Sequence, residues 1–374
     1  VKFNDIMICN LFTKNQTAEI VKIQNIGSFR IPASVNYRKK DYKITSICDH
    51  ALENSIITNL SFEKNSEIKR IGDYAFQKSK IQQLFIPSSL VQLGKYWCAG
   101  ANELLKIEVD ESNKHFSMLK EFLIFKNGST SEILFAPPNT EDKFSIQKDF
   151  CIGNYAFSNN KGLQRLVSRG SFQHLDIGDY SFYGAQDLQD VTLDSKELNI
   201  GDCCFQGSQK LQSIKITSNK LNIGNGSFVN CTSLKTANFD KIETAKISPN
   251  AFLGCESLEE FKITSSSLEI GEQCFFNAIN LKEIEIIGKE SLVIGENCFE
   301  NCTSLSSVSL INKSDENMTL PKNIFSGCKS LKSITFGSHS TINLNNESFA
   351  DNNKLETVSI VGKEIIIGNK CFFG

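Results

Sequence analysis

A six-residue string, Ile-Gly followed by two variable residues, a small residue and Phe, recurs along the chain at a nearly constant step. Clear copies occupy 71–76, 152–157, 177–182, 200–205, 223–228, 270–275, 294–299 and 367–372, and looser copies occupy 247–252, 320–325 and 344–349. From Phe157 to Phe372 successive phenylalanines are 23 to 26 residues apart, and Leu52 and Cys98 fit the same slot on either side of Phe76. A fixed period of this length predicts a solenoid in which each copy forms one coil.

A second pattern, L-x-x-I-x-I, begins six residues after each phenylalanine, as at Leu211, Ile214 and Ile216. Its last apolar residues alternate with polar ones, which is the period of a half-buried strand. A second alternating piece, such as 221–223, leads to the glycine, which suits a sharp turn or a close approach that a Cβ would obstruct. Each coil therefore has two strands and two corners with Leu, Ile and Phe pointing inward. One coil cannot bury this apolar set alone, so the coils must stack.

These patterns predict a mainly β, right-handed solenoid of 23–26-residue coils without a globular second domain. Phe76 through Phe372 are expected to stack in one internal row. We predict an N-terminal β cap at 1–43, repeats at 44–109, a β-hairpin insertion at 110–146 and repeats at 147–374 with a truncated last coil. The hairpin prediction rests on two apolar pieces, 122–125 and 133–135, around a polar loop containing Gly128. We expect the hairpin to project from the edge of the solenoid.

The chain resembles the BspA-like leucine-rich-repeat proteins over nearly its whole length. The resemblance is carried by the IGxxAFxxCxxLxxIxIP pattern, the N-terminal cap and the insertion with DESNKHF at 110–116, FLIF at 122–125 and LFAPP at 134–138. It implies a leucine-rich-repeat fold and a surface protein that adheres to host cells, matrix proteins or other microbes, and it supplies no catalytic residues. The strand-ending proline of the family survives here mainly at Pro87.

Composition excludes several classes of partner. The formal net charge is −2 and no basic stripe appears, which argues against nucleic acid. No apolar run approaches the ~20 residues needed to span a bilayer, so we expect no membrane contact by this segment. The four histidines lie in different coils or in the insertion without metal-ligand or catalytic spacing, and the recurring glycines lack the lysine of a phosphate loop. We predict no catalytic residues and no cofactor.

The thirteen cysteines follow the repeat. One group directly precedes the repeat phenylalanine and another lies three residues after it, in slots where other coils have Ala or Ser: Cys204, Cys274, Cys298 and Cys371, then Cys231, Cys255, Cys302 and Cys328. Both slots favour a small buried residue, and a free cysteine suits that environment. We predict no disulfide and no bound metal, and close to thirteen titratable thiols in the denatured protein.

Nine Asn-x-Ser/Thr sequons occur, at Asn15, Asn59, Asn127, Asn225, Asn230, Asn301, Asn312, Asn317 and Asn346. Such sequons suit a secreted protein, although a chain rich in Asn and Ser contains several by chance. Ser227 and Ser348 fall in the buried slot before the phenylalanine, so those two sequons are interpreted as fortuitous.

The outward row of the principal strands remains as a candidate binding surface. Its predicted contact residues are Lys215, Asn238, Glu260, Lys262, Glu283, Glu285, Ser309 and Thr335. A long sheet of short polar side chains is a surface that a solenoid can offer to an extended partner, although it is equally compatible with a merely solvated face. We predict a non-enzymatic protein-binding or adhesion module at the cell surface or secreted. The alternative is a cytoplasmic scaffold or regulator.

The sequence stops two residues after Phe372, where every earlier coil continues into its L-x-x-I-x-I strand. We therefore expect the native protein to continue beyond residue 374 with more coils, a cap, or a stalk and membrane anchor.

Overall fold

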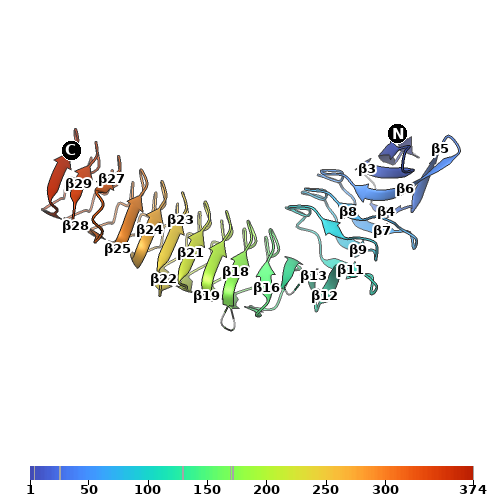
Figure 1. Cartoon of the computed structure of the whole chain (residues 1–374), viewed down its shortest axis with the longest axis horizontal. Helices are drawn as coiled ribbons and strands as arrows, with labels where there is room; N and C mark the ends of the chain where they lie inside the picture. Colours follow the sequence, from blue (N-terminus) through green and yellow to red (C-terminus); the bar gives the residue numbers. More distant parts are fainter. Residues whose placement is uncertain (4, 25–26, 129, 169, 171, 374) are drawn as a thin grey trace. The chain divides into compact units, whose positions relative to one another are not determined.

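The computed structural model describes residues 1–3, 5–24, 27–128, 130–168, 170 and 172–373. Every regular element in these residues is a strand, and the fold is a β-solenoid of about 15 turns (Figure 1). The chain forms two compact units: unit 1 comprises Val1–Thr140 and Ile152–Asn159, and unit 2 comprises Glu141–Cys151 and Asn160–Gly374. The described residues include no helix with the length and hydropathy needed to cross a membrane. The predicted solenoid fold is confirmed.

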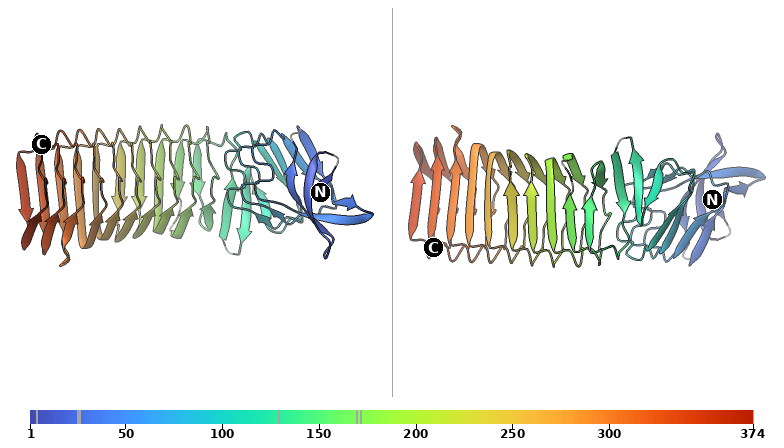
Figure 2. Two further views of the ribbon diagram at one scale, coloured as in Figure 1. Left: turned by 90° about the horizontal axis from the view of Figure 1, so that it is seen from above. Right: turned by 90° about the horizontal axis from the view of Figure 1, so that it is seen from below.

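Unit 2 contains two rows of parallel strands that run along the coils (Figure 2). The principal row consists of β15 (Lys143–Ile146), β17 (Arg165–Ser168), the first part of β19 (Asp190–Ile200), β20 (Ser213–Thr217), β22 (Thr236–Asp240), the first parts of β24 (Glu260–Ile270) and β25 (Glu283–Ile294), β26 (Ser307–Asn312), β28 (Ser333–Ser338) and β30 (Thr357–Val361). The second row consists of β18 (Phe172–Ile177), β21 (Lys220–Ile223), β23 (Thr244–Ile247), the later parts of β19, β24 and β25, then β27 (Met318–Leu320), β29 (Thr341–Leu344) and β31 (Glu364–Ile367). The short β16 is Phe150–Ile152.

The repeat phenylalanines of unit 2 form the predicted internal row. From Phe182 to Phe372, neighbouring ring centroids are 5.1–5.5 Å apart and their planes differ by 2–13°. Phe205, Phe228 and Phe275 are fully buried, whereas Phe372 in the last coil is 43% exposed. Their spacing matches the distance between parallel strands, so the ring stack and the strand ladder reinforce each other.

The glycine of the repeat marks the close approach of two coils. A Cβ on Gly201 would lie 2.5 Å from Asp179 Oδ1 and 2.6 Å from its backbone nitrogen. The residue after the glycine joins successive coils, because Asp179 Oδ1 accepts a hydrogen bond from the Asp202 N–H (2.9 Å) and Asp202 Oδ1 accepts one from the Asn225 N–H (2.7 Å). The Ile-Gly-Asp string is therefore required by inter-coil packing.

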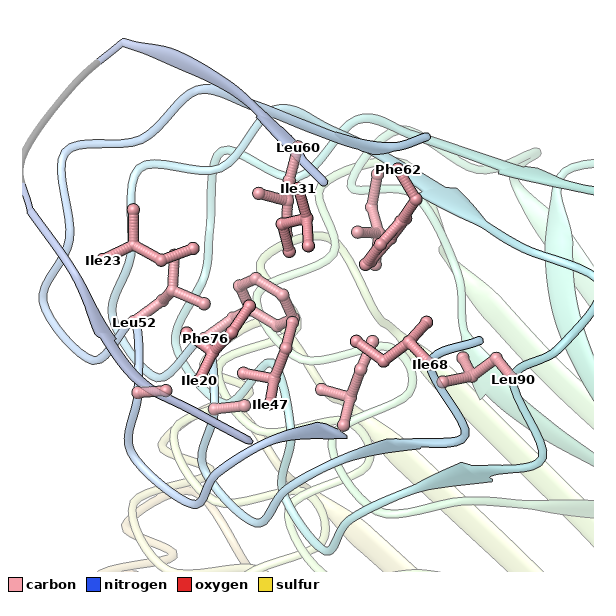
Figure 3. Packing of buried hydrophobic residues seen from close by; sticks show 14 of the residues in the cluster. Ile20, Ile23, Ile31, Ile47, Leu52, Leu60, Phe62, Ile68, Phe76 and Leu90 are labelled. Atoms are coloured by element: carbon pink, nitrogen blue, oxygen red, sulfur yellow. The ribbon is translucent and has the colours of Figure 1, made fainter. Parts of the chain in front are cut away.

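The residues of the predicted N-terminal cap, 1–43, lie at the start of unit 1, and their role as a cap remains a prediction. The strands β1 (Lys2–Phe3), β2 (Met7–Phe12) and β3 (Thr17–Ile23) pair antiparallel, and β3 then pairs in parallel with β6 (Lys40–Ile47), which β8 (Arg70–Ile71) and β10 (Gln92–Leu93) follow. The strand β5 (Ser34–Tyr37) pairs antiparallel with β6. The opposite sheet contains β4 (Ser28–Ile31), β7 (Asn59–Phe62), β9 (Gln83–Ile86) and β11 (Lys106–Val109). Apolar side chains of both sheets point into one interior, as Ile20, Ile47, Ile31 and Leu60 show in Figure 3.

Two strands pair in parallel with the next coil although their own segments of the sequence lack the repeat motif. The strand β4 lies within the predicted cap yet pairs in parallel with β7, with Ile31 in register with Phe62. Similarly, β15 lies within the predicted insertion yet pairs in parallel with β17. The predicted segment boundaries at 43 and 146 remain predictions.

The residues of the predicted hairpin insertion form antiparallel strands whose apolar side chains are mostly buried, and projection from the edge of the solenoid remains a prediction. The strands β12 (Phe116–Leu119), β13 (Phe122–Asn127) and β14 (Thr130–Phe135) form an antiparallel meander. Leu123 and Ile133 are buried, and Phe122 contacts Phe157 with a centroid distance of 5.8 Å. The backbone also joins the turn of Phe157, because Ala136 N–H donates to the Ala156 carbonyl (2.8 Å). The hairpin supplies the apolar cover that a preceding repeat phenylalanine would give to Phe157.

Candidate binding surface

All eight predicted contact residues lie on the outward side of the principal strands of unit 2. We call these outward positions of β20, β22, β24, β25, β26 and β28 the strand face. The parallel register aligns Lys215 with Asn238, Glu260 with Glu283, and Lys262 with Glu285, Ser309 and Thr335 in turn. Seven of the eight side chains are exposed and Ser309 is half-buried. Because the residues between them on β20, β24, β25, β26 and β28 are buried, these strands present polar side chains outward.

The charges of the strand face are gathered on β24 and β25. Lys262 Nζ lies 3.1 Å from Glu260 Oε2 and 3.2 Å from Glu283 Oε2. Hydrogen bonds to these two carboxylates raise the pKa of Lys262 above its ordinary value. On β20, Lys215 Nζ lies 3.9 Å from a carboxylate oxygen of Asp240. Exposed pairs of this kind contribute little to stability, so a partner can replace them at small cost.

A shallow hollow of about 380 Å³ interrupts the strand face at β22. It is lined by Lys215, Ala237, Asn238, Phe239, Asp240, Glu260 and Lys262. In β22 the inward positions that hold Ile214 and Ile216 on β20 are occupied by Ala237 and Phe239, and Phe239 is only half-buried. Sequence reasoning missed this hollow, although the Ala-Asn-Phe string departs visibly from the I-x-I pattern.

The second row of unit 2 carries a separate polar cluster. His174 Nε2 lies 2.8 Å from Asp176 Oδ2, and its Nδ1 lies 3.5 Å from Glu197 Oε2. Asn199 and Asn222 extend the cluster, because Asn199 donates to Asp176 and Asn222 donates to Asn199, each at 2.7 Å. The described residues contain no group of three or more His, Cys, Asp or Glu side chains arranged to hold a metal ion. The cluster connects neighbouring coils through side-chain hydrogen bonds and the contact between His174 and Glu197.

The repeat cysteines lie inside the solenoid and make inter-coil hydrogen bonds. The thiols of Cys231, Cys255, Cys302 and Cys328 donate to the carbonyl of the repeat phenylalanine in the preceding coil, at 3.1–3.3 Å. The Ser208 hydroxyl and the Asn352 amide donate in the same way in their own coils. Burial raises the pKa of these four thiols well above the ordinary range. They are poor nucleophiles in the folded protein, because the reactive species is the thiolate. The thiol count remains a prediction.

The sequons differ in accessibility. Ser227 and Ser348 are fully buried and Asn312 is only 2% exposed, so the hydroxyls or amide of these three sequons face the interior. Five sequon asparagines are exposed: Asn15, Asn225, Asn230, Asn317 and Asn346. The side chain of Asn127 lies outside the described residues.

A family model described as a BspA-type leucine-rich repeat region, with six copies, matches residues 9–141, 150–282 and 245–374. No curated protein matches the sequence significantly. A solved leucine-rich repeat protein from Eubacterium ventriosum is similar over 99% of this chain and 93% of its own, at 18% identity and a TM-score of 0.46. The pneumococcal vaccine antigen PcpA is similar over 97% and 98%, at 15% identity and a TM-score of 0.42. A leucine-rich cell surface protein from Faecalibacterium prausnitzii is similar over 90% and 94%, at 14% identity and a TM-score of 0.33.

Proposed function

We propose that this chain, which belongs to the BspA-type leucine-rich repeat family, is a non-enzymatic protein-binding module that contacts its partner through the strand face. The observation that carries the proposal is the in-register alignment of exposed polar side chains over successive strands. The Ser and Thr side chains of this face lose less conformational entropy than its Lys and Glu side chains when a partner covers them. An extended or gently curved protein surface can therefore lie along the coils.

The charges indicate the chemistry of the partner. Glu260, Glu283 and Glu285 outnumber Lys262 on adjacent strands, so the partner should present basic groups there. The hollow at β22 offers the edge of Phe239 between Lys215 and Asp240, which suits an apolar side chain flanked by polar groups. Electrostatic complementarity of this kind mainly sets specificity and the association rate.

The family resemblance extends the proposal to adhesion. We place the protein at the cell surface or in the secreted fraction, where it attaches to host or matrix proteins. A cytoplasmic scaffold or regulator of the same fold is the alternative, and the buried unpaired thiols favour it because such thiols are more common in reducing compartments. Labelling of intact cells with a membrane-impermeant reagent distinguishes the two locations.

Charge reversal tests the binding surface. The variant Glu260→Lys, Lys262→Glu, Glu283→Lys and Glu285→Lys keeps the attraction between position 262 and its two neighbours, so the fold should be retained. We expect at least a tenfold loss of affinity for host cells or for a panel of purified matrix proteins. The matched control reverses an ion pair of the second row, Lys246→Glu with Glu269→Lys, and should bind normally.

The competing binding element is the hairpin. Deleting it would expose Phe157, so a surface substitution, Lys126→Glu on β13, is the suitable test. If binding survives the four reversals on the strand face and is lost with Lys126→Glu, the proposed surface is wrong.

A further inference from the structure

The strand β4 of unit 1 has one unpaired edge. Among the described strands, β4 ends its four-stranded sheet and pairs only with β7. In the other sheet of unit 1, the strands β2 and β1 add two further members beyond β3. The N-terminal cap therefore extends one sheet and leaves the edge of the other open. An open edge presents backbone groups that another strand can pair with.

The direction of the hydrogen bonds identifies the exposed groups. The carbonyls of Gly27 and Ile31 accept hydrogen bonds from Asn59 and Glu63, at 3.2 and 2.9 Å. Backbone groups alternate in direction along a strand, so the N–H and C=O of Ser28 and Arg30 point away from β7. Both residues are also exposed. The edge offers two donors and two acceptors at the spacing of an added strand.

A hollow of about 470 Å³ lies beside this edge. Its described lining combines apolar side chains of β1, β2 and the turn between them with residues of β4, β5 and the link between those two strands: Phe3, Ile6, Met7, Phe29, Arg30, Pro32, Ser34, Val35 and Asn36. Arg30 is the one charged residue in this described lining, and no described carboxylate shares it. The hollow therefore suits an apolar side chain with an acidic group close by.

We propose that the open edge of β4 and this hollow form a docking groove for an extended, acidic peptide segment of a partner protein. The segment adds as a strand beside β4, places one apolar side chain in the hollow, and directs a carboxylate to Arg30. A helix cannot satisfy the alternating backbone groups of Ser28 and Arg30. A second copy pairing through its own β4 would bring two Arg30 side chains onto one short ladder, where like charges repel. This groove is independent of the strand face and of the function proposed for it.

Selection with random dodecapeptides displayed on phage tests the groove. Arg30→Pro removes the outward N–H and is tolerated at an edge, because this N–H does not pair with β7. Arg30→Ala removes only the cation, and Ser34→Trp fills the hollow. Peptides selected on the natural sequence should share alternating apolar residues and an acid. The best of them should bind at least tenfold more weakly to Arg30→Pro and to Ser34→Trp, with an unchanged circular dichroism spectrum as the control for folding.

A second binding measurement tests the contact between the carboxylate of the peptide and Arg30. Replacing the acid of the selected peptide by its amide should weaken binding to the natural protein and have no effect on binding to Arg30→Ala. Hydrogen exchange in 27–35 should slow when the peptide binds. Selected peptides that bind Arg30→Pro normally, or that lack the alternating pattern, would overturn the proposal. Self-association that Arg30→Pro abolishes would also overturn it in favour of pairing between copies.

Discussion

The slot three residues after the repeat phenylalanine shows why Cys, Ser and Asn replace one another along this chain. Cys231, Ser208 and Asn352 all donate a hydrogen bond to the phenylalanine carbonyl of the coil before. Each is a short side chain with a donor that reaches this carbonyl from a buried position. The slot therefore selects a small buried side chain, which is a donor in these coils and alanine at Ala185 and Ala278, and packing alone accounts for the cysteines.

Alkaline pH should destabilise the fold through these thiols. Burial raises the pKa of Cys9 and Cys371 to about 11, and raises that of Cys231 and Cys255 further. A thiol with a raised pKa stabilises the folded state below the unfolded pKa, and this contribution is lost as pH rises from about 9 towards the folded pKa. The free energy of unfolding should therefore fall mainly between about pH 8.5 and about pH 10, by roughly 1.5 kcal/mol for each fully buried thiol.

Urea unfolding of the natural sequence and of Cys231→Ser with Cys255→Ser measures this contribution. Serine keeps the donor, as Ser208 does in its own coil, and does not ionise in this range. The double variant should lose less stability on going to alkaline pH. Equal losses in the two proteins would show that other groups, such as Lys and Tyr, account for the pH dependence.

At the scale of single elements, the sequence predicts what repeats and misses what is irregular. The row from Phe182 to Phe372 could be predicted because each ring has an equivalent one period away. The location of the hairpin could not, since its alternation shows strands but does not show that Phe122 covers Phe157. The strand β4 did leave a signal, because Ile31-Pro32 ends it in the same way as Ile86-Pro87 ends β9.

For the candidate binding surface, too, the sequence predicts the regular positions and misses the irregular one. Alternation alone places Lys262 and Glu283 outward, and the parallel register then brings them within 3.2 Å. The hollow lies where Ala237 and Phe239 take the inward positions that isoleucines hold on β20, and its depth depends on how these two side chains pack. Sequence alternation contains no information on that depth.

The repeat glycine lies between the second-row strand and the repeat turn, and adding a side chain there should lower the free energy of unfolding. In Gly201→Ala the new Cβ would lie 2.6 Å from the Asp179 nitrogen and 2.7 Å from the Gly178 carbonyl carbon, and backbone atoms cannot move aside without displacing the coil. We expect a loss of about 2–3 kcal/mol in the free energy of unfolding. The matched control is Gly207→Ala, where φ is +72° but no atom lies within 4 Å of the new Cβ, so the cost should be nearer 1 kcal/mol. Equal costs in urea unfolding would show that conformational strain outweighs the inter-coil contact.

At the scale of the whole chain, stability comes from contacts between neighbouring coils. Ring stacking, capping by Asp179 and Asp202, and the thiol hydrogen bonds all join a coil to the next one along. A solenoid held by nearest-neighbour contacts can lose order regionally. We expect such a loss of order to stay within one of the two compact units.

Phe228→Ala tests whether disorder stays within one unit. The ring is fully buried between Phe205 and Phe252, each 5.1 Å away, and its removal should cost about 3–5 kcal/mol. Phe372→Ala is the matched control, because this ring is 43% exposed and stacks on one side only, so its removal should cost much less. Hydrogen exchange with mass spectrometry should show faster exchange in Phe228→Ala across the coils from Phe182 to Phe325, whereas β2, β3 and β6 of unit 1 keep their protection. If exchange instead accelerates equally in both units, the chain unfolds as one cooperative body and the nearest-neighbour description fails.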